Sequence, residues 1–133
     1  MAGALIDARE VITAALDAGS RHDLDAVVAL TDEDFEGVVP SSMSAEPDVY
    51  LGHDGIRHYF ESFWEIVDDL HFELVEFDEV GGWTIALAHA RGSGRASGLP
   101  IDNFVVIASQ VRGGRVHRMH AYPDMDEARR ALA

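Results

Sequence analysis

The fold is decided by residues 51–80, which read LGHDGIRHYFESFWEIVDDLHFELVEFDEV. Up to residue 70 the apolar side chains recur at helical spacing, and Asp54 stands where an N-terminal cap is expected. The apolar stripe of this helix consists of Ile56, Tyr59, Phe60, Phe63 and Val67. After residue 70 the apolar period falls to two, the period of a β-strand. The stretch therefore predicts a long helix over 51–70 that leads into a sheet.

Four strands are predicted from this change of period, at residues 71–80, 83–91, 99–111 and 115–123. Glycine pairs at 81–82 and 113–114 suit tight turns within two hairpins. The glycines of HARGSGRASGLPIDN, at 89–103, lack the spacing of a phosphate-binding loop, and the chain has no lysine to support one. That stretch is therefore predicted to join two strands of a meander.

Two helices and one strand are predicted before residue 51. Apolar residues at helical spacing indicate a helix over 4–18, and Asp23 is placed to cap a second, short helix. FEGVVP at 35–40 is typical of a strand that ends at its proline. The polar residues 41–50 indicate a loop.

The end of the chain predicts one more helix, over 124–133, because Asp124 and Glu127 have the spacing of a capping box. The whole order of elements is typical of an α+β fold, with three N-terminal helices on one face of a curved, mainly antiparallel sheet and a short C-terminal helix. The length suits one domain over residues 1–133.

Composition excludes several classes of protein. The chain has no cysteine, so disulfides, thiolate nucleophiles and zinc–thiolate sites are excluded, and all 10 basic residues are arginine. The net charge of −14 repels nucleic acid and anionic lipid. Most carboxylates precede residue 90 and most arginines follow it, so we expect late arginines to pair with early acids. No secretory or membrane-spanning segment is recognisable, which predicts a cytoplasmic protein.

The strand over 101–111 is apolar on both sides. One side carries Ile101, Val105, Ile107 and Val111, and the other carries Phe104, Val106 and Ala108. Helices are expected to cover one face only, so the other face is most simply covered by a second copy of the sheet. We therefore predict a homodimer through the outer face of the sheet.

Three stretches carry a resemblance to a known superfamily: HDLDAVVALTDEDF at 22–35, VYLGHDGIRHYF at 49–60, and GRASGLPIDN at 94–103 leading into RGGRVHRMHAYPD. With the terminal DEARRAL they resemble the nuclear transport factor 2-like superfamily, the cone-shaped fold of ketosteroid isomerases, SnoaL-like polyketide cyclases and scytalone dehydratases. The resemblance implies a cone-shaped α+β barrel with a pocket for a small organic ligand. The superfamily includes enzymes and non-catalytic binders, so the fold alone does not assign an activity.

The residues of ketosteroid isomerase chemistry are not matched. The positions of its aspartate base and its acidic donor correspond to Val39 and Ile107, and the helix over 4–18 has no tyrosine. SnoaL-like cyclases use an aspartate shortly after the last strand, and Asp124 matches that spacing. Asp124 is therefore either a general base or the cap of the closing helix.

Histidine spacing gives no metal site in regular structure. His117 and His120 are three residues apart in a strand and so lie on opposite faces. His53 and His58 are five apart around a helix start, which also separates them. We predict neither a metal nor a cofactor.

His89 and Arg91 share one side of the strand over 83–91 with large apolar residues, and alanines take the other side. If the large side faces the cone, the pocket holds an imidazole and a guanidinium and suits an anionic or carbonyl-bearing ligand. If the alanine side faces the cone, as the family register has it, His89 and Arg91 lie on the surface or in a dimer contact. One bulge would exchange the two arrangements.

Further ligand contacts are implied by the family register. On the later strands these are Asn103, Val105, Ile107, His117 and Met119, and on the opposite wall Tyr50, Tyr59 and Trp64. Ordinary core packing is the alternative for the three aromatic residues, and a satisfied structural role is the alternative for Asn103 and His117.

Two functions are consistent with this sequence. The first is acid–base catalysis on a partly apolar carbonyl compound, with His89 or His117 as base or donor. Arg91 and Asn103 would then hold the carbonyl, and Asp124 would orient the substrate or abstract a proton. The second is a non-catalytic ligand-binding or dimerisation module. Two or more of the histidines, Asn103 and Asp124 meeting in one cavity would favour catalysis, and aliphatic walls would favour binding.

Overall fold

The computed structural model describes residues 8–39 and 49–133. In chain order its elements are α1 (Ala8–Ser20), α2 (Leu24–Ala29), β1 (Thr31–Val38), β2 (Val49–Leu51), α3 (Gly52–Ile66), β3 (Val67–Val80), β4 (Trp83–Gly94), β5 (Pro100–Arg112), β6 (Arg115–Tyr122) and α4 (Met125–Leu132). The α+β class agrees with the expectation from the sequence.

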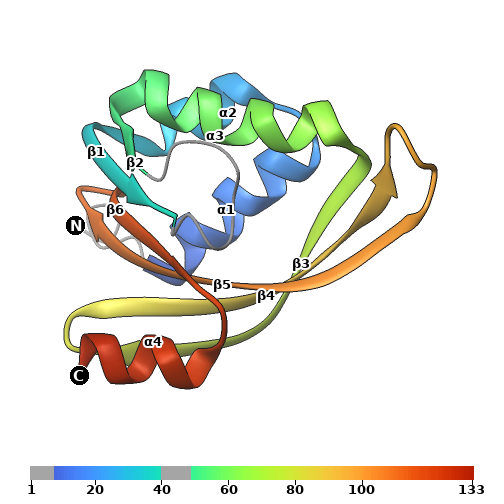
Figure 1. Ribbon diagram of the computed structural model, residues 1–133. Helices are drawn as coiled ribbons and strands as arrows, with labels where there is room; N and C mark the ends of the chain where they lie inside the picture. The colour runs from blue at the N-terminus through green and yellow to red at the C-terminus, as the bar shows by residue number, and fades with distance from the viewer. Residues whose placement is uncertain (1–7, 40–48) are drawn as a thin grey trace.

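The strands form one curved sheet in the order β2-β1-β6-β5-β4-β3 (Figure 1). β1 and β6 are parallel, and the other neighbours are antiparallel, so the sheet is mixed but mainly antiparallel. α1, α2 and α3 lie over the concave face, and α4 lies against the opposite, convex face (Figure 1). The curvature opens a space between α3 and the middle of the sheet.

Three boundaries differ from those predicted. Residues 49–51 form β2, a short edge strand, where a loop was expected. α3 then begins at Gly52, so Asp54 lies inside its first turn and pairs with Arg57 instead of capping it. α3 also ends four residues early, because Val67–Leu70 already pair with the end of β4 or lie buried under it. The proline predicted to end β1 lies outside the described residues.

The alanine side of β4 faces the helices. Ala86 and Ala88 are each 1% exposed and pack against Ile12 and Leu16 of α1. The pairing of β4 with β5 runs from Thr84 to Ser93 without a register shift, so the alternation is unbroken. Of the two arrangements left open by the sequence, the structure therefore has the one with His89 and Arg91 outside the cone.

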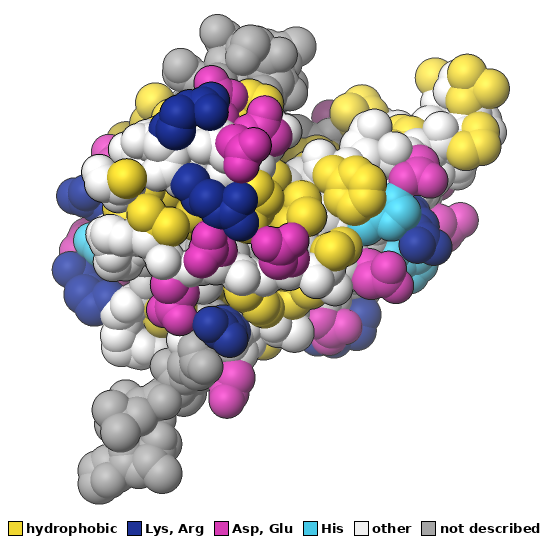
Figure 2. Space-filling model, turned by 90° about the horizontal axis from the view of Figure 1, so that it is seen from below, with side chains coloured by type: hydrophobic (Ala, Val, Ile, Leu, Met, Phe, Trp, Pro, Cys, Tyr) yellow, Lys and Arg dark blue, Asp and Glu magenta, His cyan; other side chains and the backbone are white. Residues whose placement is uncertain are grey.

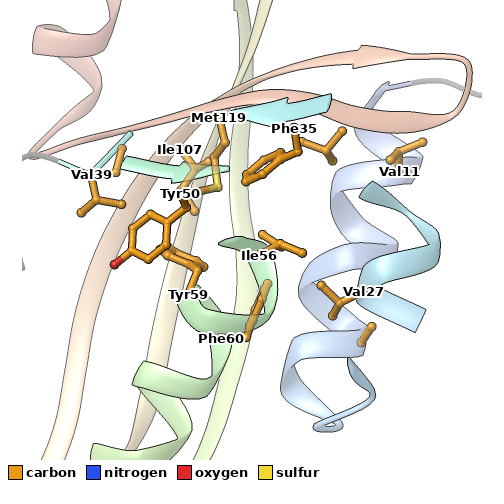
Figure 3. Close-up of a cluster of buried hydrophobic side chains, with 13 residues drawn as sticks. Val11, Val27, Phe35, Val39, Tyr50, Ile56, Tyr59, Phe60, Ile107 and Met119 are labelled. Carbon is orange, nitrogen blue, oxygen red and sulfur yellow. The ribbon is translucent and has the colours of Figure 1, made fainter. Parts of the chain in front are cut away.

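A larger core joins the helices to β1, β2 and β6. Figure 3 shows side chains from α1, α2 and α3 meeting those of the sheet in this cluster. Its members include Val11, Val27, Phe35, Ile56, Tyr59, Phe60 and Met119. This core fixes the position of α3, which in turn sets one wall of the space beneath it.

α4 covers part of the convex face. Ala128 is 0% exposed and packs with Ile85, Val106 and Ala108, which are also buried. Arg129 Nε donates to Asp78 Oδ2 on β3 at 2.7 Å, and this hydrogen bond lowers the pKa of Asp78. The expectation that helices cover one face only was wrong, because the chain's own last helix also shields apolar side chains on the second face.

Late arginines pair with early carboxylates, as predicted. Arg95 pairs with Asp68, Arg112 with Asp32, and Arg129 with Asp78 and Glu76. These ion pairs join strands and helices that are distant in sequence, so the uneven charge along the chain is partly balanced in the fold.

Enlarging Ala88 tests the placement of α1 on the alanine side of β4. Ala88→Leu should lower the free energy of unfolding by about 1–3 kcal/mol, because the added carbons have no space beneath Ile12 and Leu16. The measurement is urea unfolding. Ala14→Leu, at an exposed site on α1, is the matched control and should change stability by less than about 0.5 kcal/mol. Equal effects of the two changes would contradict this packing.

Candidate functional site

An open cavity of about 640 Å³ lies between the second half of α3 and β5. Its lining residues are Val39, Tyr50, Tyr59, Ser62, Phe63, Glu65, Ile66, Asn103, Phe104, Val105, Val106, Ile107 and Ala121. The volume is in the range of cavities that hold small organic molecules. Most of the lining is apolar or aromatic, and the polar groups come from Tyr50, Tyr59, Ser62, Asn103 and Glu65.

A second, deeper space of about 50 Å³ continues toward α1 and α2. It shares Tyr59 and Ile107 with the open cavity and is otherwise lined mainly by aliphatic and aromatic side chains. A volume of this size holds roughly one or two water molecules and no organic ligand. The open cavity is therefore the candidate binding site, and the deeper space marks its apolar floor.

The structure brings together five of the sequence-predicted ligand contacts. Tyr50, Tyr59, Asn103, Val105 and Ile107 all line the open cavity. They come from β2, α3 and β5, three elements that are distant in sequence. The polar members are therefore two phenols and one amide.

Met119 lies at the floor of the site. It is 6% exposed, lines the deeper space and belongs to the main core. Its position agrees with the inward orientation that the sequence predicted for it. It supports the floor of the cavity from β6.

Tyr59 joins the cavity wall to the core. Its ring packs edge-on against Tyr50 at 5.4 Å and against Phe63 at 5.1 Å. Burial raises the pKa of the Tyr59 phenol, so its hydroxyl stays protonated at neutral pH. A protonated phenol donates a hydrogen bond and adds no charge to the site.

Trp64 has a structural role outside both cavities. Its indole Nε1 donates to the carbonyl of Gly19 at 3.2 Å, and its ring stacks on His22 with centroids 4.6 Å apart. These contacts tie α3 to the end of α1. Trp64 lines neither of the two spaces.

His89 and Arg91 lie on the convex face. Arg91 Nε donates to His89 Nδ1 at 3.1 Å, and His89 Nε2 bonds Asp102 on β5. The hydrogen bond from His89 lowers the pKa of Asp102. The imidazole also stacks on Phe104, with centroids 4.7 Å apart. The structure therefore does not bring these two residues to the cavity.

His117 is displaced by a bulge between β5 and β6. The register shifts between Gln110 and Val111, so Val116 takes the inward position. His117 lies close enough to Asp32 to contribute to lowering its pKa. It lines neither of the two spaces, and its buried Nδ1 has no hydrogen-bond partner among the described residues.

Asp124 caps α4. Its Oδ1 accepts a hydrogen bond from the backbone N–H of Glu127 at 2.8 Å, which is the capping contact predicted from their spacing. α4 lies on the convex face, away from the open cavity (Figure 1). Of the two roles left open for Asp124, the structure supplies the contact for the cap.

Sequence reasoning missed the rim residues of α3. Ser62, Glu65 and Ile66 line the cavity, but the helix was expected to continue to residue 70. The signal available was Ile66, which falls outside the apolar stripe of the helix and is 64% exposed. An apolar residue off the buried stripe indicates a surface with another role.

Within 8–39 and 49–133, no group of three or more metal-ligating side chains has the geometry to hold an ion. None of the helices in that part of the chain is long and apolar enough to cross a membrane. The site must therefore be understood from its own side chains.

Changing Asp124 separates a capping role from a role in the cavity. Asp124→Ala should lower the free energy of unfolding by about 1 kcal/mol, and Asp124→Asn by a few tenths at most, because Asn caps almost as well as Asp. Urea unfolding measures both variants. Loss of ligand binding in either folded variant would contradict the assignment of Asp124 to the cap alone.

Comparisons with known proteins agree with this architecture. IdmH, a proposed polyketide cyclase from Streptomyces antibioticus, matches at 17% identity over 93% of this chain and 96% of its own, with a TM-score of 0.74. TerC co-crystallised with polyporic acid matches at 21% identity over 93% and 95%, with a TM-score of 0.74. A Catenulispora acidiphila protein with a ketosteroid isomerase-like fold, in complex with trimethylamine, matches at 16% over 93% and 94%, with a TM-score of 0.73. At these identities the likeness shows the fold.

A comparison with curated protein sequences found no significant match. The family model of the SnoaL-like domain matches residues 12–119, which include α1 from its second turn and every strand at least in part. The chain therefore belongs to the SnoaL-like domain family, within the nuclear transport factor 2-like superfamily.

Proposed function

We propose that this protein binds a small, largely apolar organic molecule in the open cavity between α3 and β5. The observation that carries the proposal is the cavity itself: about 640 Å³, with aromatic and aliphatic walls and a few neutral polar groups. Tyr50, Tyr59 and Asn103 would orient the ligand through hydrogen bonds to a hydroxyl or carbonyl group. Val105 and Ile107 would contact its apolar body.

Binding is favoured over acid–base catalysis by what lines the cavity. Of the two histidines, Asn103 and Asp124, only Asn103 is a lining residue. A general base must reach the proton that it removes, within about 3 Å or through one water. Because His89 and Asp124 are engaged on the convex face, the geometry supports a binding module, which is the second of the two functions that the sequence left open.

Two of the structural neighbours hold small organic molecules, polyporic acid in one and trimethylamine in the other. These complexes support a binding role for the cone in this chain as well. They differ in charge and size, so they do not select a ligand for it.

Blocking the cavity should abolish binding of a neutral probe. 2-Naphthylmethanol should bind with a Kd in roughly the millimolar range or tighter, as measured by the anisotropy of its fluorescence. Ser62→Trp should weaken this binding at least about tenfold, because the indole fills the space beside Tyr59. Glu61→Trp, exposed on the same helix and not lining the cavity, is the matched control.

Ala121→Leu fills the same cavity from β6 and provides a second variant if Ser62→Trp does not fold. Circular dichroism and thermal unfolding establish that each variant is folded. Full binding by folded variants of both kinds would overturn the proposed site.

We also propose that two copies of the chain associate through the part of the convex face that α4 leaves open. Phe104 is 59% exposed there, beside the partly buried Leu87. Hydrophobic side chains gather in the middle of this face, between arginines and carboxylates (Figure 2). Exposed aromatic side chains in such a setting are typical of protein interfaces.

Light scattering after size exclusion tests this association. At micromolar concentration the protein should be a dimer, and Phe104→Glu should convert it to a monomer, because a carboxylate would be buried without a partner. Leu51→Glu, exposed on the edge strand β2, is the control and should stay dimeric. A monomeric native protein would contradict the proposal.

A further inference from the structure

The inference below concerns the charge of the ligand and rests on the proposed binding site. The lining of the open cavity includes no arginine and no histidine among the described residues. All 10 basic residues of the chain are arginines, and all fall within the described ranges. No cationic side chain is therefore available in the cavity to pair with an anionic ligand.

The arginines are engaged elsewhere. Those that form ion pairs with carboxylates are Arg9, Arg21, Arg57, Arg91, Arg95, Arg112 and Arg129. Arg91 is the one that the sequence offered as a partner for an anionic ligand, and it is bound to His89 and Glu73 on the convex face. An anionic group entering the cavity would lose hydration and gain no counter-charge.

The groups that are present suit a positive charge. Glu65 is the charged lining residue, and it lies exposed at the rim on the last turn of α3. Tyr50, Tyr59 and Phe63 supply three aromatic rings that contact one another edge-on. Aromatic faces attract ammonium groups, and the phenol and amide oxygens of Tyr50 and Asn103 are hydrogen-bond acceptors.

His58 contacts the Tyr50 ring, with centroids 5.8 Å apart, and belongs in any account of charge near the site. It is exposed on α3 and does not line the cavity. At about pH 8 an ordinary exposed imidazole is neutral, so measurements at that pH remove its contribution.

We propose that the cavity selects an organic ammonium compound over a carboxylate of the same shape. The apolar body of the ligand lies against Val105 and Ile107. Its ammonium group lies toward the rim, between the aromatic wall and Glu65, where it keeps part of its hydration. The ligand class is therefore an amine with an aromatic or aliphatic body of a size that fits about 640 Å³.

Three probes of one shape test this selection: 2-naphthylmethylammonium, 2-naphthylmethanol and 2-naphthoate. Their affinities are measured by fluorescence anisotropy at about pH 8, where the amine keeps most of its charge. The ammonium compound should bind about tenfold more tightly than the carboxylate, with the alcohol between them. Carboxylate binding equal to or tighter than that of the ammonium compound would overturn the inference.

Long-range attraction must be separated from local contact, because the net charge of −14 favours any cation near the surface. At 0.5 M salt the Debye length is about 4 Å, which suppresses the field of distant carboxylates. The preference should persist there at about threefold or more. Its disappearance at high salt would overturn the local selection proposed here.

Glu65→Gln should weaken binding of the ammonium probe about threefold and leave the alcohol unchanged. Glu61→Gln removes the same charge from an exposed position on the same helix and should leave both affinities unchanged. Equal effects of the two substitutions would contradict the role of Glu65.

Failure of this inference is distinguishable from failure of the proposed function. If the alcohol binds and Ser62→Trp blocks it, the cavity is the binding site whatever the order of the charged probes. If that binding is unaffected by both cavity-filling variants, the proposed function itself falls, and the charge selection falls with it.

Discussion

The alternation of small and large side chains along β4 is the constraint on which the rest of the structure depends. Ala86 and Ala88 leave room for Ile12 and Leu16, so α1 can lie close to the concave face. The large side chains of the same strand must then point outward, where α4 packs over Ile85. Curvature, the covering of both faces and the space beneath α3 all follow from this single choice of side.

The same choice decides the chemistry of the cavity. His89 and Arg91 share the outward side, so their hydrogen bonds are made with each other and with Asp102 and not with a ligand in the cone. The walls that remain are apolar or neutral, and their one carboxylate stands at the rim. A fold that the superfamily uses for several activities therefore presents here a cavity with the features of a binding site.

Much of the fold could be predicted from the sequence, because the change of period near residue 70 and the glycine pairs are local signals. The capping contact of Asp124 was equally local and was confirmed. The side of β4 was not predictable, since one bulge reverses it, and a bulge does displace His117 on β6. The place of α4 was missed because its short apolar stripe does not say which face of the sheet it meets.

The central claim is that the space between α3 and β5 is where a ligand binds. Intermolecular nuclear Overhauser effects between 2-naphthylmethanol and the methyl-labelled protein test it most directly. The account predicts contacts from the naphthalene protons to Val105, Ile107 and Ala121, which share the cavity. Contacts confined to Leu87 and its neighbours on the convex face would contradict it.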